Sequence, residues 1–283
     1  MARHKTFQFL SRGASLHAQK WWPDSGYPKA VVLCVHSWSS HSGRFSGLAE
    51  YLSRSGYAVY AFDFAGHGHS EGQRAHVDDF DHWVADLTNF IEVVHNELRS
   101  VPLFLLGAGV GGLAVATYLS THHNDVDGAV FNACALAEGK DITPFHRWLA
   151  WVLGSIVPRL PVTRITFPQQ MTRDPAELAE LTQDPLMWFG KMTAGTGKQL
   201  IFATARIAKN LGNIQLPFLV QQGMADTLVA PACGEAIYHQ GSGIDKTLKE
   251  YPGALHDLLH EGIRESVFDD IRVWLDGRGA KRW

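Results

Sequence analysis

The sequence has little cysteine, little charge imbalance and no apolar run long enough to cross a bilayer. Three cysteines occur among 283 residues (Cys34, Cys134 and Cys233), too widely separated for a zinc site or a disulfide framework. The formal net charge of −3 provides none of the basic surface that nucleic-acid binding requires. The first residues contain no apolar core of a signal peptide. We therefore expect a soluble, cytoplasmic protein that binds no nucleic acid.

Apolar residues are abundant, at 46% of the chain, and they occur in short runs. Runs typical of buried strands alternate with segments whose apolar residues recur at helical spacing, which predicts a mostly parallel sheet with helices on both faces. The expected strands are residues 6–10, 15–22, 30–35, 58–62, 101–106, 128–131, 216–220 and 247–251. The expected helices are residues 45–52, ended by Gly56, residues 80–98, capped by Asp78 or Asp79, and residues 113–119 and 263–275.

One region breaks this alternation. No strand is expected between residues 137 and 210, and the stretch from Pro144 to Val157 is apolar on nearly all sides. Such a helix is either buried in the core or faces an apolar surface, and both interpretations stay open. We expect residues 1–136 and 211–283 to form the α/β core, and residues 137–210 to form a helical lid inserted between two strands.

A glycine-rich turn joins the expected strand at residues 101–106 to the helix that follows it. Residues 107–112 read Gly-Ala-Gly-Val-Gly-Gly. This setting is typical of the Gly-x-Ser-x-Gly nucleophile elbow, with Gly109 in place of the serine. Gly107, Gly109 and Gly112 also satisfy the Gly-x-Gly-x-x-Gly dinucleotide fingerprint. That motif needs an acidic residue after the next strand to hold the ribose, where this chain has Asn132-Ala133-Cys134. An NAD-binding oxidoreductase is kept as an alternative.

An acid and a histidine follow the last two expected strands. Asp226 comes after residues 216–220, and His256 comes after residues 247–251. The carboxyl ends of parallel strands meet at one edge of a sheet, where ligands bind. The order of nucleophile position, Asp and His is the order found in α/β-hydrolases. We therefore expect Asp226 and His256 to form a pair that faces Gly109.

With these residues in place, the chain resembles the monoacylglycerol lipases and related lysophospholipase-type esterases of the α/β-hydrolase superfamily. The resemblance runs from about residue 30 to the C-terminus. It is carried by residues 41–45 (His-Ser-Gly-Arg-Phe), 66–72 (Gly-His-Gly-His-Ser-Glu-Gly), 184–186 (Asp-Pro-Leu), 223–226 (Gly-Met-Ala-Asp) and 253–256 (Gly-Ala-Leu-His). It implies an α/β-hydrolase fold and a carboxylic ester hydrolase that acts on single-chain lipids without a cofactor.

The resemblance also implies a role for individual residues. Asp226 would be the acid, His256 the base and Gly109 the nucleophile position, while the main-chain amides of Trp38 and Val110 would form the oxyanion hole. A mobile lid would contact the lipid substrate and, peripherally, a membrane. Its expected substrate-binding residues are Trp148, Leu149, Trp151 and Val152.

Two positions depart from the family pattern, Gly109 at the elbow and Ser37 where the family has His-Gly. The oxyanion donors are main-chain atoms, so these changes do not remove them. Ser37 would distort its turn if that position needs a positive φ. Three explanations of Gly109 stay open: a serine removed on purpose, a natural protein that binds without cleaving, and catalysis by His256 as a general base without a covalent intermediate.

Two further candidates are expected to be structural. Ser70 lies in a second Gly-x-Ser-x-Gly, but it is separated from its strand and no helix follows it directly, so we expect a loop role. His67 and His69 lie close to Asp63 without a convincing third ligand. We therefore expect no metal site.

Overall fold

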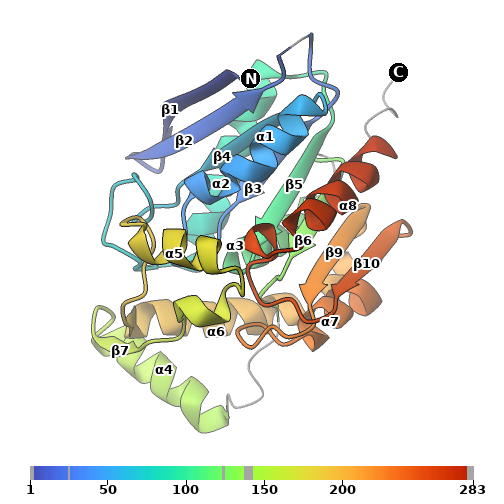
Figure 1. Cartoon of the computed structure of the whole chain (residues 1–283). Helices are drawn as coiled ribbons and strands as arrows, with labels where there is room; N and C mark the ends of the chain where they lie inside the picture. The colour runs from blue at the N-terminus through green and yellow to red at the C-terminus, as the bar shows by residue number, and fades with distance from the viewer. Residues whose placement is uncertain (1–2, 25, 123–124, 137–142, 279–283) are drawn as a thin grey trace.

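A computed structural model describes residues 3–24, 26–122, 125–136 and 143–278 (Figure 1). Within these residues, eight strands form one sheet, in the order β1-β2-β4-β3-β5-β6-β9-β10. Strand β2 runs antiparallel to both of its neighbours, and from β4 to β10 all neighbours are parallel. The strands are β1 (Arg3–Ser11), β2 (Ala14–Trp22), β3 (Val31–Val35), β4 (Ala58–Phe62), β5 (Leu103–Ala108), β6 (Gly128–Asn132), β9 (Phe218–Gly223) and β10 (Lys246–Tyr251).

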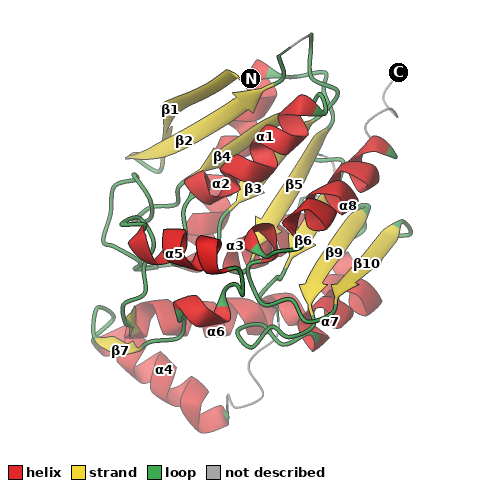
Figure 2. Cartoon of the chain, in the orientation of Figure 1, coloured by secondary structure: helices red, strands yellow, loops and turns green. Residues whose placement is uncertain are grey.

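Helices cover both faces of this sheet, so the expected α/β architecture is confirmed (Figure 2). Helices α1 and α8 pack together on one face, and α2 and α3 pack together on the other. The helices of this part are α1 (Ser46–Arg54), α2 (Phe80–Glu97), α3 (Val110–Leu119), α7 (Ala232–Gln240) and α8 (Arg264–Asp276), with single 3₁₀ turns η1 (Ser42–Phe45), η3 (Leu211–Asn213) and η4 (Leu258–His260).

The central strands form because their residues are apolar and suit burial on both faces. Every residue of β3, β4 and β6 is buried, as expected for parallel strands covered by helices. Strand β5 begins at Leu103 rather than at the expected residue 101. Pro102, which has no amide hydrogen for the ladder, lies directly before it.

The predicted helix boundaries correspond to local capping interactions. The side chain of Asp79 accepts a hydrogen bond from the amide of Asp81, so Asp79 rather than Asp78 caps α2. Gly56 follows α1 with a φ of 90°, a conformation that a residue with a Cβ rarely adopts.

The described residues between β6 and β9 contain three helices, which lie beyond the carboxyl ends of the parallel strands (Figure 1). The expectation that this segment contains no strand is wrong, because β7 and β8 pair in a short antiparallel ladder. These strands are too short to give a periodic signal in the sequence. The elements are α4 (Pro144–Ile156), β7 (Pro161–Thr163), η2 (Pro168–Gln170), α5 (Pro175–Gln183), β8 (Met192–Thr193) and α6 (Ala194–Ala208).

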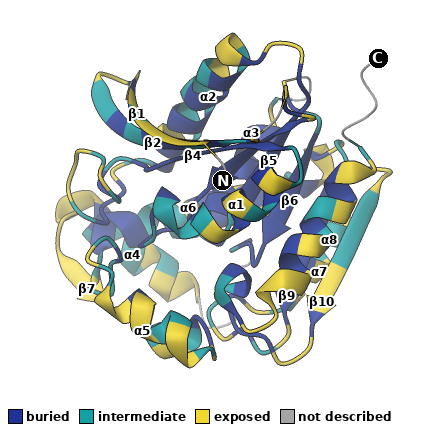
Figure 3. Cartoon of the chain, turned by 45° about the horizontal axis from the view of Figure 1, so that its top comes forward, coloured by how far each residue is buried: buried dark blue, intermediate teal, exposed yellow. Residues whose placement is uncertain are grey.

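Helix α4 is not a buried core helix, so one of the two interpretations of this apolar stretch is wrong. Within α4, all of which is described, Gly154 is the only buried residue. It packs closely against α6: a Cβ at Gly154 would lie 2.6 Å from the Cβ of Lys198. The opposite face exposes Phe145, Trp148 and Trp151 by 62%, 56% and 53%. Figure 3 shows the burial class of each described residue along the ribbon. No helix in the described part of the chain is long and apolar enough to cross a membrane.

The close approach of α3 to β3 gives a test of the fold. A Cβ at Gly111 would lie 2.2 Å from the carbonyl oxygen of Val35. We therefore expect Gly111→Ala to lower the free energy of unfolding by about 1–3 kcal/mol through overpacking. Gly47, in helix α1, has no such neighbour within 3.8 Å, so Gly47→Ala should raise this free energy by about 0.5–1 kcal/mol. Urea unfolding followed by tryptophan fluorescence measures both, and a Gly111→Ala variant as stable as the parent would contradict the packing.

Candidate active site

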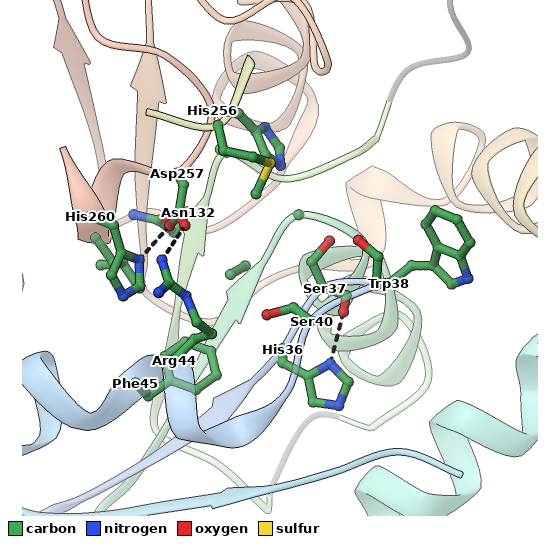
Figure 4. Close-up of a pocket in the computed structure, with 16 residues that line it drawn as sticks. His36, Ser37, Trp38, Ser40, Arg44, Phe45, Asn132, His256, Asp257 and His260 are labelled. Atoms are coloured by element: carbon green, nitrogen blue, oxygen red, sulfur yellow. Dashed lines mark hydrogen bonds and ion pairs between the residues drawn. The ribbon is translucent and has the colours of Figure 1, made fainter. Parts of the chain in front are cut away.

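Four loops that follow parallel strands meet at the carboxyl edge of the sheet. They carry Ser37 after β3, Gly109 after β5, Asp226 after β9 and His256 after β10. Ser37, Gly109 and His256 line the same pocket. In Figure 4, Ser37 lies on the loop after β3, and His256 lies across the pocket from it. The fold therefore brings together four loops that lie far apart in the sequence.

Gly109 has the backbone of a nucleophile elbow but no side chain. It lies between β5 and α3 with a φ of 52° and a ψ of −120°, a conformation that is costly for residues other than glycine. The turn is tight because small residues face each other across it: a Cβ at Gly107 would lie 2.5 Å from the Cα of Gly112. The elbow therefore exists in this chain without the hydroxyl that it presents in serine hydrolases.

Asp226 and His256 form the expected pair. The Asp226 Oδ2 and the His256 Nδ1 are 2.8 Å apart, and both side chains are buried. The other carboxylate oxygen of Asp226 accepts the amides of Leu228 and Val229, at 2.8 and 2.9 Å. With Nδ1 held in this way, the His256 Nε2 lies 3.4 Å from the point where a Cβ at position 109 would stand. The Nε2 of this imidazole thus faces the elbow, which is the orientation that a general base at this site would need.

The pKa of His256 is raised above its usual value near 6.5. Burial by itself lowers this pKa, because it disfavours the charged imidazolium. The hydrogen bond to Asp226 and the negative charge of that carboxylate act in the opposite direction and outweigh burial. The protonated imidazolium of His256 is therefore stabilised by Asp226.

The loop that carries His256 is tied to the segment between β6 and β9. The amide of Asp257 donates to the carbonyl of Met171 at 2.7 Å. The amide of His256 donates to the carbonyl of Gln170 at 3.5 Å. Gln170 and Met171 belong to η2 and the residue that follows it. The loop of His256 thus follows β10 of the sheet and is bound to this inserted segment.

The loop after β3 is fixed by buried hydrogen bonds. The His36 Nε2 accepts the amide of Phe64 at 3.0 Å, so its Nδ1 carries the proton and donates to the Ser37 carbonyl at 2.7 Å. Burial lowers the pKa of His36 to about 4, which keeps the ring neutral at pH 7. The Trp38 indole donates to the Ala75 carbonyl at 2.9 Å.

Ser37 does not distort this turn, because the positive φ of the loop falls on Ser39, at 70°, and not on Ser37. Its side chain reaches into the elbow instead. The Ser37 Oγ accepts the amide of Val110 at 3.1 Å. One of the two amides expected to form the oxyanion hole is thus already bound to a side-chain hydroxyl.

The pocket has a polar part and an apolar part that meet at Gly109. In the polar part, Asp257 binds Arg44 at 3.2 Å and His260 at 2.8 Å (Figure 4). Burial raises the pKa of Asp257, but the charges of His260 and Arg44 outweigh it and hold this pKa well below its usual range. Arg44 was not expected to line the pocket, although Arg44 lies in one of the segments that carry the family resemblance.

The apolar part of the pocket is lined by Val110, Leu113, Ile165, Leu200, Leu228 and Val229.

The expected substrate-binding residues of the lid are not in this pocket. None of Trp148, Leu149, Trp151 and Val152 lines either part of it, as far as the chain is described. This correction has a simple physical reason: the inner face of α4 packs on α6, which turns Trp148 and Trp151 outward. The inserted segment lines the pocket instead with residues that follow α4 in the chain: Ile165, Thr166, Met171, Leu200 and Thr204.

The remaining candidates are structural in this fold. The Ser70 Oγ donates to the Asp63 carbonyl at 2.6 Å and accepts the amide of His17 at 2.9 Å, away from the pocket. Strand β6 ends at Asn132, whose amide group donates to Gln221, so the acidic residue of a dinucleotide site is missing there. The described residues contain no group of three His, Cys, Asp or Glu side chains that could hold a metal.

An elbow after a parallel strand, with an Asp–His pair supplied by the last two strands, defines an α/β-hydrolase. The comparison with known proteins gives the family. The family described as "Hydrolase_4: Serine aminopeptidase, S33" matches residues 26–262, and this chain belongs to it.

Similar proteins of this family are known from several organisms. Monoglyceride lipase from Rattus norvegicus is 32% identical over 92% of this chain and 87% of its own length. Monoacylglycerol lipase from Mycolicibacterium smegmatis is 29% identical over 90% of both chains. The crystal structure of the monoacylglycerol lipase from Paleococcus ferrophilus superposes with a TM-score of 0.83, at 30% identity, over 93% of this chain and 99% of that one.

The environment of His256 predicts how its titration responds to Asp226→Asn. Removing the carboxylate charge leaves burial dominant, so the pKa of His256 should fall below 6.5. In the parent, the raised pKa stabilises the fold fully below pH 6.5, and this contribution is lost as pH rises through the folded-state pKa. The variant should therefore be least stable, relative to the parent, at pH 6, and the gap should narrow by pH 9.

NMR titration of the histidine Hε1 resonances and urea unfolding at the two pH values measure these effects. Asp184→Asn is the matched control, because this carboxylate binds His41 and not His256. A His256 pKa that is the same in the parent and in Asp226→Asn would contradict the assignment of the raised pKa to Asp226.

Proposed function

We propose that the pocket binds single-chain lipid esters of the monoacylglycerol type, with the ester carbonyl beside Gly109. The observation that carries this proposal is the His256 Nε2, 3.4 Å from the Cβ position of residue 109, at the junction of a polar and an apolar part of one pocket. We assign the polar head group to the side of Arg44, Asp257 and His260, and the acyl chain to the apolar side. The names of the related lipases support the same substrate class.

The reaction proposed for this site is carboxylic ester hydrolysis, with His256 as base and Asp226 as the acid that orients it. The main-chain amides of Trp38 and Val110 are the proposed oxyanion donors. Gly109 offers no hydroxyl, and loss of a serine nucleophile costs about 10⁶-fold in kcat in the case of subtilisin. We therefore propose that hydrolysis that depends on a nucleophile at position 109 is strongly impaired in this chain. A purely ligand-binding protein is the second candidate, which the same glycine favours.

A pair of substitutions on α6 tests the binding site. Leu200 lines the apolar part, whereas Phe202, on the same helix, is 42% exposed and outside the pocket. Leu200→Gln should weaken binding of a monoacylglycerol about tenfold or more, because a polar group would then be buried beside the acyl chain. Phe202→Gln should leave binding unchanged. Thermal shift against lipid concentration measures both affinities. Equal affinities in the two variants would contradict the proposed acyl-binding site.

We also propose that residues 137–210 form the lid of this pocket and rest on a lipid surface. Exposed apolar side chains on one face of α4 support this proposal: Phe145, Trp148, Trp151 and Ile156. Exposed aromatic residues are costly in water and stabilising at a bilayer interface. Part of the lid, residues 137–142, lies outside the described residues.

The lipid-facing role of α4 predicts the behaviour of the double variant Trp148→Ser/Trp151→Ser. Liposome association should fall by about tenfold or more, since two large apolar side chains no longer enter the interface. Val273→Ser removes an exposed apolar side chain from α8, on the other side of the fold, and is the control. Co-sedimentation with phosphatidylcholine liposomes measures the partitioning. Equal partitioning of the parent and the double variant would refute the role.

A further inference from the structure

We propose that Ser37 supplies the nucleophilic hydroxyl of this site, in exchange for the one absent at position 109. The proposal rests on the proposed function, since it assigns a nucleophile to the same ester-binding pocket. The resemblance described under the sequence analysis implies glycine at position 37 and serine at position 109, whereas this chain has serine at 37 and glycine at 109. The two departures are thus complementary rather than independent.

The Ser37 hydroxyl occupies the space that a side chain at position 109 would fill. An ideal Cβ built on Gly109 would lie 2.4 Å from the Ser37 Oγ and 2.9 Å from the Ser37 Cβ. Real Cβ atoms essentially never approach other atoms so closely. A side chain at position 109 would therefore require Ser37 to shift, and in this conformation the space is held by the hydroxymethyl group of Ser37.

His256 faces the same space beside position 109. The His256 Nε2 lies 3.4 Å from the Cβ position of residue 109, and the Ser37 Oγ lies 2.4 Å from the same position. Ser37 and His256 line both parts of the pocket. Because the Ser37 Oγ accepts the Val110 amide, its own proton remains free to be donated. Catalytic hydrogen bonds commonly shorten only once substrate is bound, so a rotation of Ser37 toward Nε2 fits a general-base role of His256.

The main-chain donors around Ser37 match those of an elbow serine. In an elbow, one oxyanion donor is the amide of the residue after the nucleophile. The Trp38 amide has this relation to Ser37, as the Val110 amide has to residue 109. The Trp38 amide donates to no atom of the described chain, so it is free for a substrate oxygen. The Val110 amide, at 3.1 Å from the Ser37 Oγ, stabilises negative charge on that oxygen or on the adjacent oxyanion.

The resulting reaction is balanced. The Ser37 Oγ forms a bond to the ester carbonyl carbon while its proton passes to the His256 Nε2. The bond from this carbon to the alcohol oxygen then breaks, and the alcohol leaves with the proton from His256. In the second half, water gives a proton to His256 and attacks the acyl carbon. The bond to Oγ breaks, the fatty acid leaves, and Oγ recovers the proton.

Active-site labelling tests the assignment. The protein is incubated with a fluorophosphonate, and the modified residue is located by peptide mass spectrometry. We expect the label on Ser37, its loss in Ser37→Ala, and a decrease of about tenfold or more in His256→Gln. Hydrolysis of p-nitrophenyl butyrate should follow the same pattern. Its rate should fall as pH drops through the raised pKa of His256, because only the neutral imidazole accepts the proton.

The exchanged variant Ser37→Gly/Gly109→Ser is the matched control, because it moves the hydroxymethyl group from position 37 to position 109 and keeps one such group in the pocket. It should be labelled at position 109. Gly109→Ser alone should be less stable than the exchanged variant, because two side chains then compete for one volume.

Folded parent protein without a label on Ser37 would overturn the proposal, whether or not the exchanged variant is labelled. Monoacylglycerol binding by Ser37→Ala, followed by thermal shift, reports on the proposed function separately: absence of binding in both parent and variant would refute the binding site itself.

Discussion

The hydrogen bond between Asp226 and His256 is the interaction on which the site depends. It joins the loops after the last two strands, fixes which imidazole nitrogen faces the elbow, and raises the pKa of the ring although burial lowers it. The amides of Leu228 and Val229 hold the carboxylate in turn. This pair leaves the His256 Nε2 facing the elbow, 3.4 Å from the Cβ position of residue 109.

Space at the elbow is the second constraint. The Ser37 Oγ, the Val110 amide and the Cβ position of residue 109 lie within about one hydrogen-bond length of one another. A glycine at 109 alone would leave a void there and an amide without a partner. With Ser37 present, the void is filled and the amide of Val110 is satisfied. The two unusual residues are therefore best understood as one local arrangement.

The sequence predicted the sheet well, because buried parallel strands such as residues 58–62 and 128–131 are continuous apolar runs between turn residues. It also placed Gly109, Asp226 and His256 at one edge, because the order of strands and polar residues follows a topological rule. It did not reveal β7 and β8, which are too short for any period. It did not settle how α4 is oriented, because its apolar residues on both faces suit a core as well as a surface. The contact of Ser37 with the elbow depends on loop geometry between residues far apart in the chain, which no local pattern encodes.

The attachment of the histidine loop to Gln170 and Met171 divides the inserted segment into two mechanical parts. Any movement of residues 170–171 would pull on the backbone of His256 and misalign its ring with the elbow. Displacement of α4, which contacts α6 but has no such link to the histidine, leaves the ring in place. Residues 170–171 therefore hold the loop of His256 in place, while α4, no residue of which lines either described part of the pocket, has no part in positioning that histidine.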